Sequence, residues 1–176
     1  MTNSRTAMIY SSVDGHTLKI CNRLLDVLKK DRQSIELFSI EEFQEDISQF
    51  DRLILGASIR YGVHNKQVIE FINTNKEQLD YIKTAFFSVN LVARKPEKNT
   101  PQTNPYVIKF FKKIDWTPTM VAVFAGMLDY KKYPFWDRIM IQLIMRITKG
   151  PTDLNTKIEY TDWEKVDAFA ARLGKL

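Results

Sequence analysis

Residues 6–17 read TAMIYSSVDGHT, a short apolar run followed at once by a loop of small and hydroxyl-bearing residues. The run 6–10 has the length and composition of a strand that is buried on both faces. Apolar residues recur at helical spacing directly after the loop, across residues 17–30. A strand, a tight loop and a helix in this order begin a βαβ unit, which predicts an α/β fold.

The same alternation continues along the chain. Further strands are predicted at 34–38, 52–56, 84–89 and 119–125, and further helices at 65–79, at 105–114 and from Thr161 onward. Thr161 and Glu164 match a capping box at the start of the last helix. Right-handed crossovers place helices on both faces of a parallel sheet. We therefore predict a doubly wound, five-stranded parallel sheet in a single domain over residues 1–176.

Length, charge and composition narrow the classes of function. The chain has 176 residues and a formal net charge of +5, without any block of five like charges, which indicates a basic patch facing anionic partners. The single Cys21, expected in the core, and the two histidines leave no set of metal ligands, so we expect no metal. Stacking aromatics interleaved with basic residues are not evident, so we expect no nucleic acid. No apolar stretch reaches the roughly 18 residues of a spanning helix.

The loop after the first strand has the character of an anion site. Ser11, Ser12 and Thr17 offer hydroxyl donors, and Gly15 lies immediately before a helix whose N-terminus favours negative charge. The loop has no Lys and neither the GK[ST] nor the G-x-G-x-x-G pattern, which argues against a nucleoside-triphosphate or dinucleotide loop. A phosphate held by neutral donors suits a bound monophosphate cofactor. A turn with a helix N-cap is the plainer alternative.

Two residues of this loop need separate interpretation. The carboxylate of Asp14 would repel a phosphate if it pointed inward. We therefore expect Asp14 to turn outward or to cap N–H groups of the loop. His16 is expected to lie near the phosphate and not to act as a catalytic base.

Two further loops follow neighbouring strands, so they meet the first loop at the carboxyl edge of the sheet. Residues 58–62, SIRYG, place Tyr61 where its ring can lie flat against a planar ligand and Arg60 where it can face an anionic group. Residues 88–93, SVNLVA, offer backbone groups to the edge of the same ring. Each loop alone can be a solvated turn, but three at one edge predict mononucleotide binding of the flavodoxin kind.

The phosphate loop resembles that of flavodoxins, with Asp14 in place of their usual Thr. The chain is more similar still to the family of menaquinone-dependent protoporphyrinogen IX dehydrogenases, flavodoxin-like enzymes of bacterial heme synthesis. The similarity runs over nearly the whole chain. It is carried by GASIRYG (56–62), SVNLVARKPEKNTPQTNPY (88–106), DRIMIQLIM (137–145) and YTDW (160–163).

The resemblance implies one FMN per chain, oxidation of protoporphyrinogen IX to protoporphyrin IX, and electron transfer to menaquinone or ubiquinone. It implies that FMN is held by Ser11, Ser12, Val13, Asp14, Gly15, His16, Thr17, Ser58, Ile59, Arg60, Tyr61, Gly62, Ser88, Val89, Asn90, Leu91, Val92 and Ala93. It also implies a peripheral protein on the cytoplasmic face of the bacterial inner membrane. No side chain stands out as a catalytic base, and a homo-oligomer stays open.

Two other functions stay as alternatives. A flavodoxin-type electron carrier is typically acidic, whereas this chain is basic. An NAD(P)H–quinone reductase of related fold would need a nicotinamide site, for which no separate motif is present.

Residues 126–150 form a basic amphipathic segment inserted near the last strand, as in long-chain flavodoxins. In its helical part, Arg138, Gln142 and Arg146 lie on one face and apolar residues cover most of the remainder. Such a helix can lie in a membrane interface, wall an apolar pocket, or pack on the protein's own core or another subunit. We expect contact with the substrate or with an anionic membrane surface from Arg94, Lys95, Lys131, Lys132, Trp136, Arg138 and Arg146.

Overall fold

The computed structural model describes residues 4–29 and 34–176. Lys30, the expected last residue of the first helix, lies outside this part of the chain. The main sheet runs in the order β2-β1-β3-β5-β6, and all four pairings between these strands are parallel. Its strands are β1 (Arg5–Ser11), β2 (Ser34–Ser39), β3 (Arg52–Arg60), β5 (Lys83–Asn90) and β6 (Met120–Ala125). The predicted five-stranded, doubly wound sheet is therefore confirmed. A ligand is expected where the strand order reverses, beside the carboxyl ends of β1 and β3.

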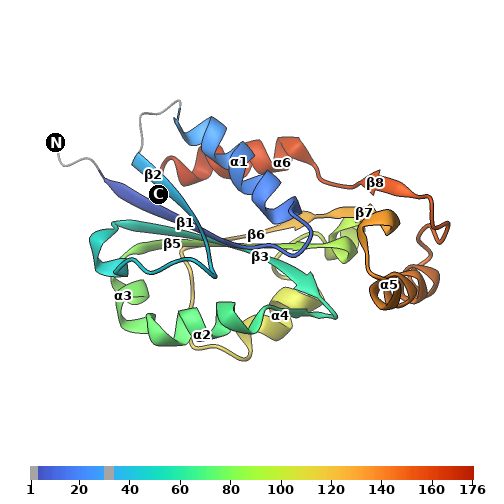
Figure 1. Cartoon of the computed structure of the whole chain (residues 1–176). Coiled ribbons are helices and arrows are strands. Elements are labelled where there is room, and N and C mark those ends of the chain that lie inside the picture. The colour runs from blue at the N-terminus through green and yellow to red at the C-terminus, as the bar shows by residue number, and fades with distance from the viewer. Residues whose placement is uncertain (1–3, 30–33) are drawn as a thin grey trace.

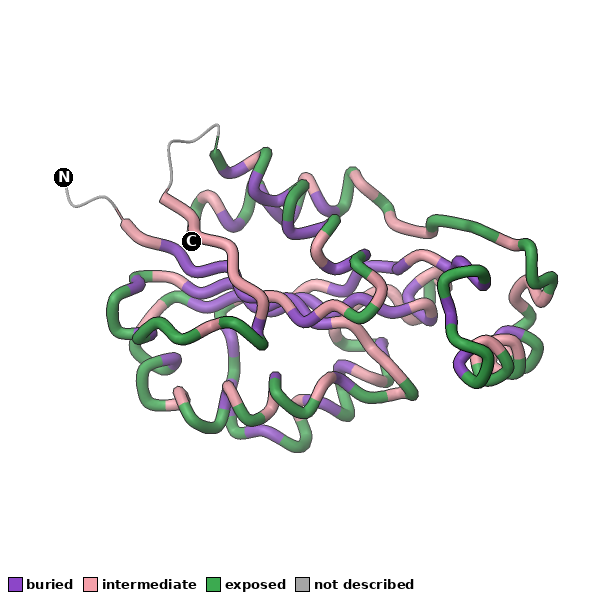
Figure 2. Tube along the Cα trace, in the orientation of Figure 1, coloured by how far each residue is buried: buried purple, intermediate pink, exposed green. Residues whose placement is uncertain are grey.

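Helices cover both faces of the sheet (Figure 1). One face carries α1 (His16–Leu28) and α6 (Trp163–Leu173), and the other carries α2 (Lys66–Thr74), α3 (Lys76–Tyr81) and α4 (Pro105–Phe111). Successive strand residues point to opposite faces, so Met8 packs with α1 and α6 while Ile9 packs with the helices opposite. The buried strands lie between these two layers (Figure 2). Cys21 is fully buried in the first layer, as expected.

The predicted helix 65–79 is in fact two helices, α2 and α3, which meet at Asn75. The Asn75 side-chain amide donates to the Phe71 carbonyl at 2.9 Å. Asn competes in this way with regular helix hydrogen bonding and therefore favours helix ends. Apolar periodicity alone does not register this competition.

The predicted capping box at the last helix is wrong. The N-cap of α6 is Asp162, whose carboxylate accepts from the Lys165 backbone N–H at 3.1 Å. The Thr161 hydroxyl instead donates to the Ala125 carbonyl at the end of β6, at 2.8 Å. The Thr161 hydroxyl therefore makes a long-range hydrogen bond to the sheet and not the N-cap bond that the local sequence pattern predicted.

Between β6 and α6 the chain leaves the main sheet over residues 126–162, a segment that we call the excursion. The expected inserted segment 126–150 forms most of it. The excursion contains β7 (Met127–Asp129), the 3₁₀ turn η5 (Tyr130–Lys132), α5 (Phe135–Ile147) and β8 (Lys157–Glu159). Strands β7 and β8 pair antiparallel, so the excursion closes on itself beyond residue 150. Figure 1 shows α5 past the carboxyl edge of the sheet. No helix in the described ranges has the length and apolar character needed to cross a membrane.

Close packing of β3 on β5 gives the first testable prediction. Gly56 pairs with Phe87, and a Cβ at Gly56 would lie under 3.0 Å from Cζ of the Phe87 ring, far inside van der Waals contact. Gly56→Ala should therefore lower the free energy of unfolding by about 1–3 kcal/mol, the usual cost of overpacking. Denaturant unfolding measures the change. The control is Gly126→Ala, whose Cβ would make only ordinary contact with Val89 at 3.4 Å. Equal stability of the two variants would contradict the packing argument.

Candidate functional site

A cleft opens at the carboxyl edge of the sheet and encloses about 1030 Å³ of empty space, including its mouth. Three loops at the strand ends form one side, and the excursion forms the other. The predicted convergence of the loops at one edge is thus present in the structure.

The loop after β1 brings unpaired polar atoms to this cleft. Helix α1 has Gly15 as its N-cap, with φ of 79°, and no side chain caps its first N–H groups. The left-handed conformation suits glycine, and no atom lies within 4 Å of where a Cβ would stand. Ser12 Oγ, Thr17 Oγ1 and His16 Nδ1 are buried without a hydrogen-bond partner. Buried polar groups are rarely left unpaired, so this set fits an anion such as a phosphate.

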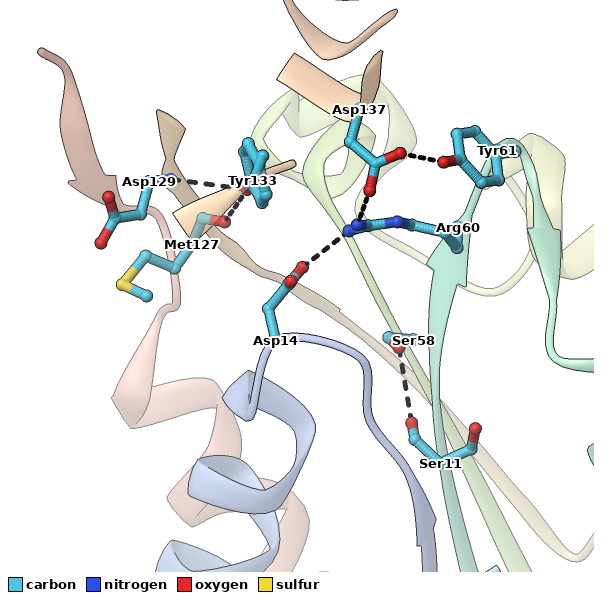
Figure 3. Close-up of polar contacts among 9 residues, drawn as sticks. All are labelled: Ser11, Asp14, Ser58, Arg60, Tyr61, Met127, Asp129, Tyr133 and Asp137. Carbon is cyan, nitrogen blue, oxygen red and sulfur yellow. Dashed lines mark hydrogen bonds and ion pairs between the residues drawn. The ribbon is translucent and has the colours of Figure 1, made fainter. Parts of the chain in front are cut away.

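Asp14 turns away from these donors toward Arg60. The Arg60 Nη1 group donates to Asp14 Oδ2 at 3.0 Å, while Nη2 donates to the carboxylate of Asp137 in α5 (Figure 3). Asp14 was expected to turn outward or to cap N–H groups of the loop; in the structure it lines the cleft, and its partner is a guanidinium. One cation therefore joins the loop after β1, the end of β3 and the excursion.

Asp137 also accepts a hydrogen bond from the Tyr61 hydroxyl (Figure 3). That hydrogen bond, together with the Arg60 charge, holds the pKa of the Asp137 carboxyl below its usual range. The same hydrogen bond raises the pKa of Tyr61, because the phenol donates to a charged acceptor. Asp137 is only 7% exposed, and its charge is satisfied by two donors from the β3 end, Arg60 and Tyr61.

Tyr61 occupies a tight turn between β3 and the short β4 (Val63–His64). Tyr61 and Gly62 have φ of 50° and 77°, so both central positions are left-handed, as in the type I′ turns favoured in hairpins. The Tyr61 ring lines the cleft and is 63% exposed. An aromatic face is thereby presented at the cleft rim, held at its hydroxyl by Asp137.

The loop after β5 is shaped by the buried amide of Asn90. Its carbonyl oxygen accepts from the Ala93 N–H at 3.0 Å and from Asn104 Nδ2 at 3.1 Å. Its own Nδ2 donates to Ser88 Oγ at 3.3 Å, and that hydroxyl also meets His64 Nε2 at 2.9 Å. Burial lowers the pKa of His64 to about 3, so this imidazole is a neutral support for the strand end.

Most of the residues expected to hold the cofactor line the cleft, and some do not. Those that line the cleft are Ser12, Asp14, His16, Thr17, Ser58, Ile59, Arg60, Tyr61, Gly62, Val89, Asn90, Leu91 and Val92. The cleft lining does not include Ser11, Val13, Gly15, Ser88 or Ala93. Ser11 is buried, and its carbonyl accepts from the Ser58 hydroxyl at 3.4 Å (Figure 3).

The residues expected to contact substrate or membrane fall into three groups: some bond within the protein, some line the cleft and some are exposed. Arg94 donates to the Leu91 carbonyl and to Thr148, so it ties the loop after β5 to the end of α5. Arg138 donates to the Tyr133 carbonyl within the excursion. Arg94 and Lys132 line the cleft, whereas Lys131, Trp136 and Arg146 are exposed and Lys95 is half-buried.

Sequence reasoning left open whether the excursion walls a pocket and did not name the residues that do so. The residues concerned are Tyr106 of α4 together with Gly126, Met127, Asp129, Tyr133, Met140, Ile141 and Ile144. It also missed Asp137, whose one signal was an isolated acidic residue at the start of an apolar helix. Its partner Arg60 is 77 positions away, a distance that no local motif spans.

Comparison with known proteins agrees with this geometry. Residues 7–155 match the family model described as a flavodoxin domain. The chain is 41% identical over 173 residues to protoporphyrinogen IX dehydrogenase (quinone) of Escherichia coli strain K12, covering 98% of this chain and 96% of that one. The protein of the same name from Leishmania major is 40% identical over 171 residues, covering 96% of this chain and 74% of that one.

Among solved structures, oxidised flavodoxin 1 from Bacillus cereus superposes with a TM-score of 0.58 at 17% identity, covering 98% of each chain. This likeness confirms the fold alone. The sequence relatives confirm the closer resemblance, because their similarity runs over nearly the whole chain. The chain belongs to the flavodoxin-domain family and, within it, to the family of quinone-type protoporphyrinogen IX dehydrogenases.

Proposed function

We propose that this protein oxidises protoporphyrinogen IX to protoporphyrin IX, with FMN as cofactor and a membrane quinone, menaquinone or ubiquinone, as electron acceptor. One observation carries the proposal: a single cleft joins an uncapped helix N-terminus with unpaired donors to an apolar wall from α5. The first part suits a phosphate, and the second suits an apolar macrocycle or quinone. The names of the sequence relatives support the same substrate pair.

The chain's residues suggest how FMN would be held. Ser12, His16 and Thr17 would meet the phosphate together with the free N–H groups of α1. The ring of Tyr61 would lie against the isoalloxazine, and the backbone of 89–92 would meet its edge. When bound, the flavin supplies the two-electron redox chemistry.

The remaining cleft residues would bind and orient the porphyrinogen. Met140, Ile141 and Ile144 supply apolar contacts, and Lys132 supplies a cation for a propionate carboxylate. Both terminal nitrogens of Arg60 are already paired with carboxylates, so we assign Arg60 to positioning the cleft walls. No side chain is assigned as a base, so protons from the macrocycle would be released to water.

Helix α5 suggests how the protein meets its lipid-soluble partner. Its polar residues Asp137, Arg138 and Gln142 bond back to the protein. Its outward side is apolar and consists of Phe135, Trp136, Ile139, Met140, Leu143 and Ile147, all exposed. We call these six residues the α5 apolar face. The exposed cations Lys131, Lys132 and Arg146 accompany it.

An exposed apolar face of this extent, bordered by cations, matches a helix lying in an anionic membrane interface. We therefore propose peripheral attachment to the cytoplasmic face of the inner membrane. Met140 belongs both to the α5 apolar face and to the cleft lining. A quinone leaving the lipid could thus reach the cleft along a continuous apolar surface.

The activity itself is the first test. Purified protein loaded with FMN should oxidise protoporphyrinogen IX without oxygen when a soluble quinone analogue is present, and product fluorescence follows the reaction. NADPH in place of the porphyrinogen should give no quinone reduction. Turnover with NADPH alone would favour the reductase alternative. Failure to oxidise porphyrinogen despite full flavin reduction by external donors would favour an electron carrier.

The contact between Tyr61 and the flavin is tested by paired tyrosine variants. Tyr61→Ala should weaken FMN binding by roughly 3- to 10-fold, the worth of an aromatic contact. Tyr61→Phe keeps the ring and loses only the hydroxyl bonded to Asp137, so it should retain most of the affinity. Tyr81→Ala is the control, since Tyr81 is 90% exposed on α3 and is not among the cleft residues. Flavin fluorescence titration measures all three, and unchanged affinity in Tyr61→Ala would refute the contact.

Membrane attachment is tested on the α5 apolar face. Leu143→Glu combined with Ile147→Glu should reduce binding to vesicles containing phosphatidylglycerol by roughly tenfold or more, because burial of each aliphatic side chain is lost. Tyr81→Glu places a charge on the 90% exposed Tyr81 of α3, outside the α5 apolar face, and should leave sedimentation with vesicles unchanged. If the double variant binds vesicles as well as the unmodified protein, the α5 apolar face does not meet the membrane.

A further inference from the structure

The protonation state of His16 follows from counting hydrogens. The Thr161 hydroxyl has one hydrogen, and it is donated to the Ala125 carbonyl at 2.8 Å. The same oxygen lies 2.6 Å from His16 Nε2. Since the carbonyl can only accept, the hydroxyl must accept from the ring, and Nε2 therefore carries a hydrogen.

The other ring nitrogen is left bare in the neutral form. Nδ1 is buried without a partner, in a residue that is 8% exposed and lines the cleft. His16 is the first residue of α1, and its neighbour Thr17 has a fully buried hydroxyl that is also unpaired. Two unpaired polar atoms thus accompany an uncapped helix N-terminus. This bare nitrogen can take up a proton and then donate it in a hydrogen bond. The amide of a glutamine or asparagine cannot take up a proton in this way.

The charges around His16 keep the ring neutral when the cleft holds no anion. Burial lowers the pKa of the imidazole from its usual value; Glu159 of β8 opposes this, and Lys19 of α1 and Lys132 of η5 add to the lowering. Helix α6 contributes the uncharged ring of Trp163, with centroids 6.3 Å apart. The Glu159 carboxylate is itself engaged by Lys19 Nζ at 2.6 Å. A dianion placed at the helix N-terminus would reverse this balance.

We propose that binding of the FMN phosphate is coupled to uptake of one proton at His16 Nδ1, which then donates a charge-assisted hydrogen bond to the phosphate. The inference rests on the proposed FMN site and adds a proton to its binding equilibrium. Linkage between proton and FMN binding sets the direction in which the FMN affinity changes with pH. The bound state holds the extra proton between the lower pKa of the free protein and the raised pKa of the complex. Affinity therefore increases as the pH falls through that window, by up to about tenfold per pH unit.

Calorimetry of FMN binding to flavin-free protein tests the coupling. Titrations near pH 7.5 in buffers of different ionisation enthalpy report the number of protons taken up. We expect the unmodified protein to take up a larger fraction of a proton than His16→Gln, which keeps a neutral polar side chain. The variant also retains the phosphate's own titration, with a pKa near 6, as a shared background. Riboflavin lacks the phosphate and should show no difference between the two proteins.

A second measurement avoids any variant. In ¹⁵N-labelled protein, the His16 Nδ1 resonance should move from the unprotonated to the protonated position when FMN is added. Equal proton uptake in the unmodified protein and His16→Gln, with an unmoved Nδ1 resonance, would overturn the coupling and leave FMN binding intact. The same difference with riboflavin would place the donor partner on the ribityl chain and also overturn it. Absence of any FMN binding would overturn the proposed function itself.

Discussion

The guanidinium of Arg60 holds together three parts of the chain that the sheet alone does not connect. Asp14 comes from the loop after β1, Arg60 from the end of β3, and Asp137 from the excursion outside the sheet. Partly buried charges are costly unless they are paired, so removing Arg60 would leave two carboxylates beside the cleft without their shared cation. This ion pairing, together with the bonds of Arg94 to Thr148 and of Gln142 to the Thr152 carbonyl, positions α5 and the apolar wall of the cleft.

The other end of the cleft follows the opposite principle. Helix α1 begins without a side-chain cap, and three buried polar atoms near its first turn are unpaired. Local stability is thereby lower at the place where a ligand would complete the hydrogen bonding. Departures from local rules of this kind are expected at functional sites, because the ligand supplies what the chain omits. On one side of the cleft the charged side chains of Asp14, Arg60 and Asp137 pair with one another. On the other side, the polar atoms at the start of α1 lack partners that a bound anion would supply.

Helix α5 carries apolar residues on both of its sides. On the side toward the protein, Met145 is fully buried and Ile141 packs against the same cluster, while Asp137, Arg138 and Gln142 bond to Arg60, to the Tyr133 carbonyl and to the Thr152 carbonyl. The α5 apolar face is directed outward, and Trp136 and Ile147 are 74% and 72% exposed. In water this arrangement is unfavourable, since an amphipathic helix normally buries its apolar side. At a lipid surface, as proposed for this helix, the outward apolar residues would be buried, and membrane attachment would then lie beside the proposed access route of the quinone.

Local periodicity and connectivity were sufficient to predict the sheet, its order of elements and the three loops at its carboxyl edge, because short apolar strands and right-handed crossovers leave few alternatives. Those signals act over a few residues. Only the tertiary structure decided that Asp137 meets Arg60 and Tyr61, that Thr161 serves His16 across 145 positions, and which side of α5 faces outward. The partners of charged and hydroxyl side chains are selected by long-range packing, and packing depends on the whole fold rather than on sequence spacing.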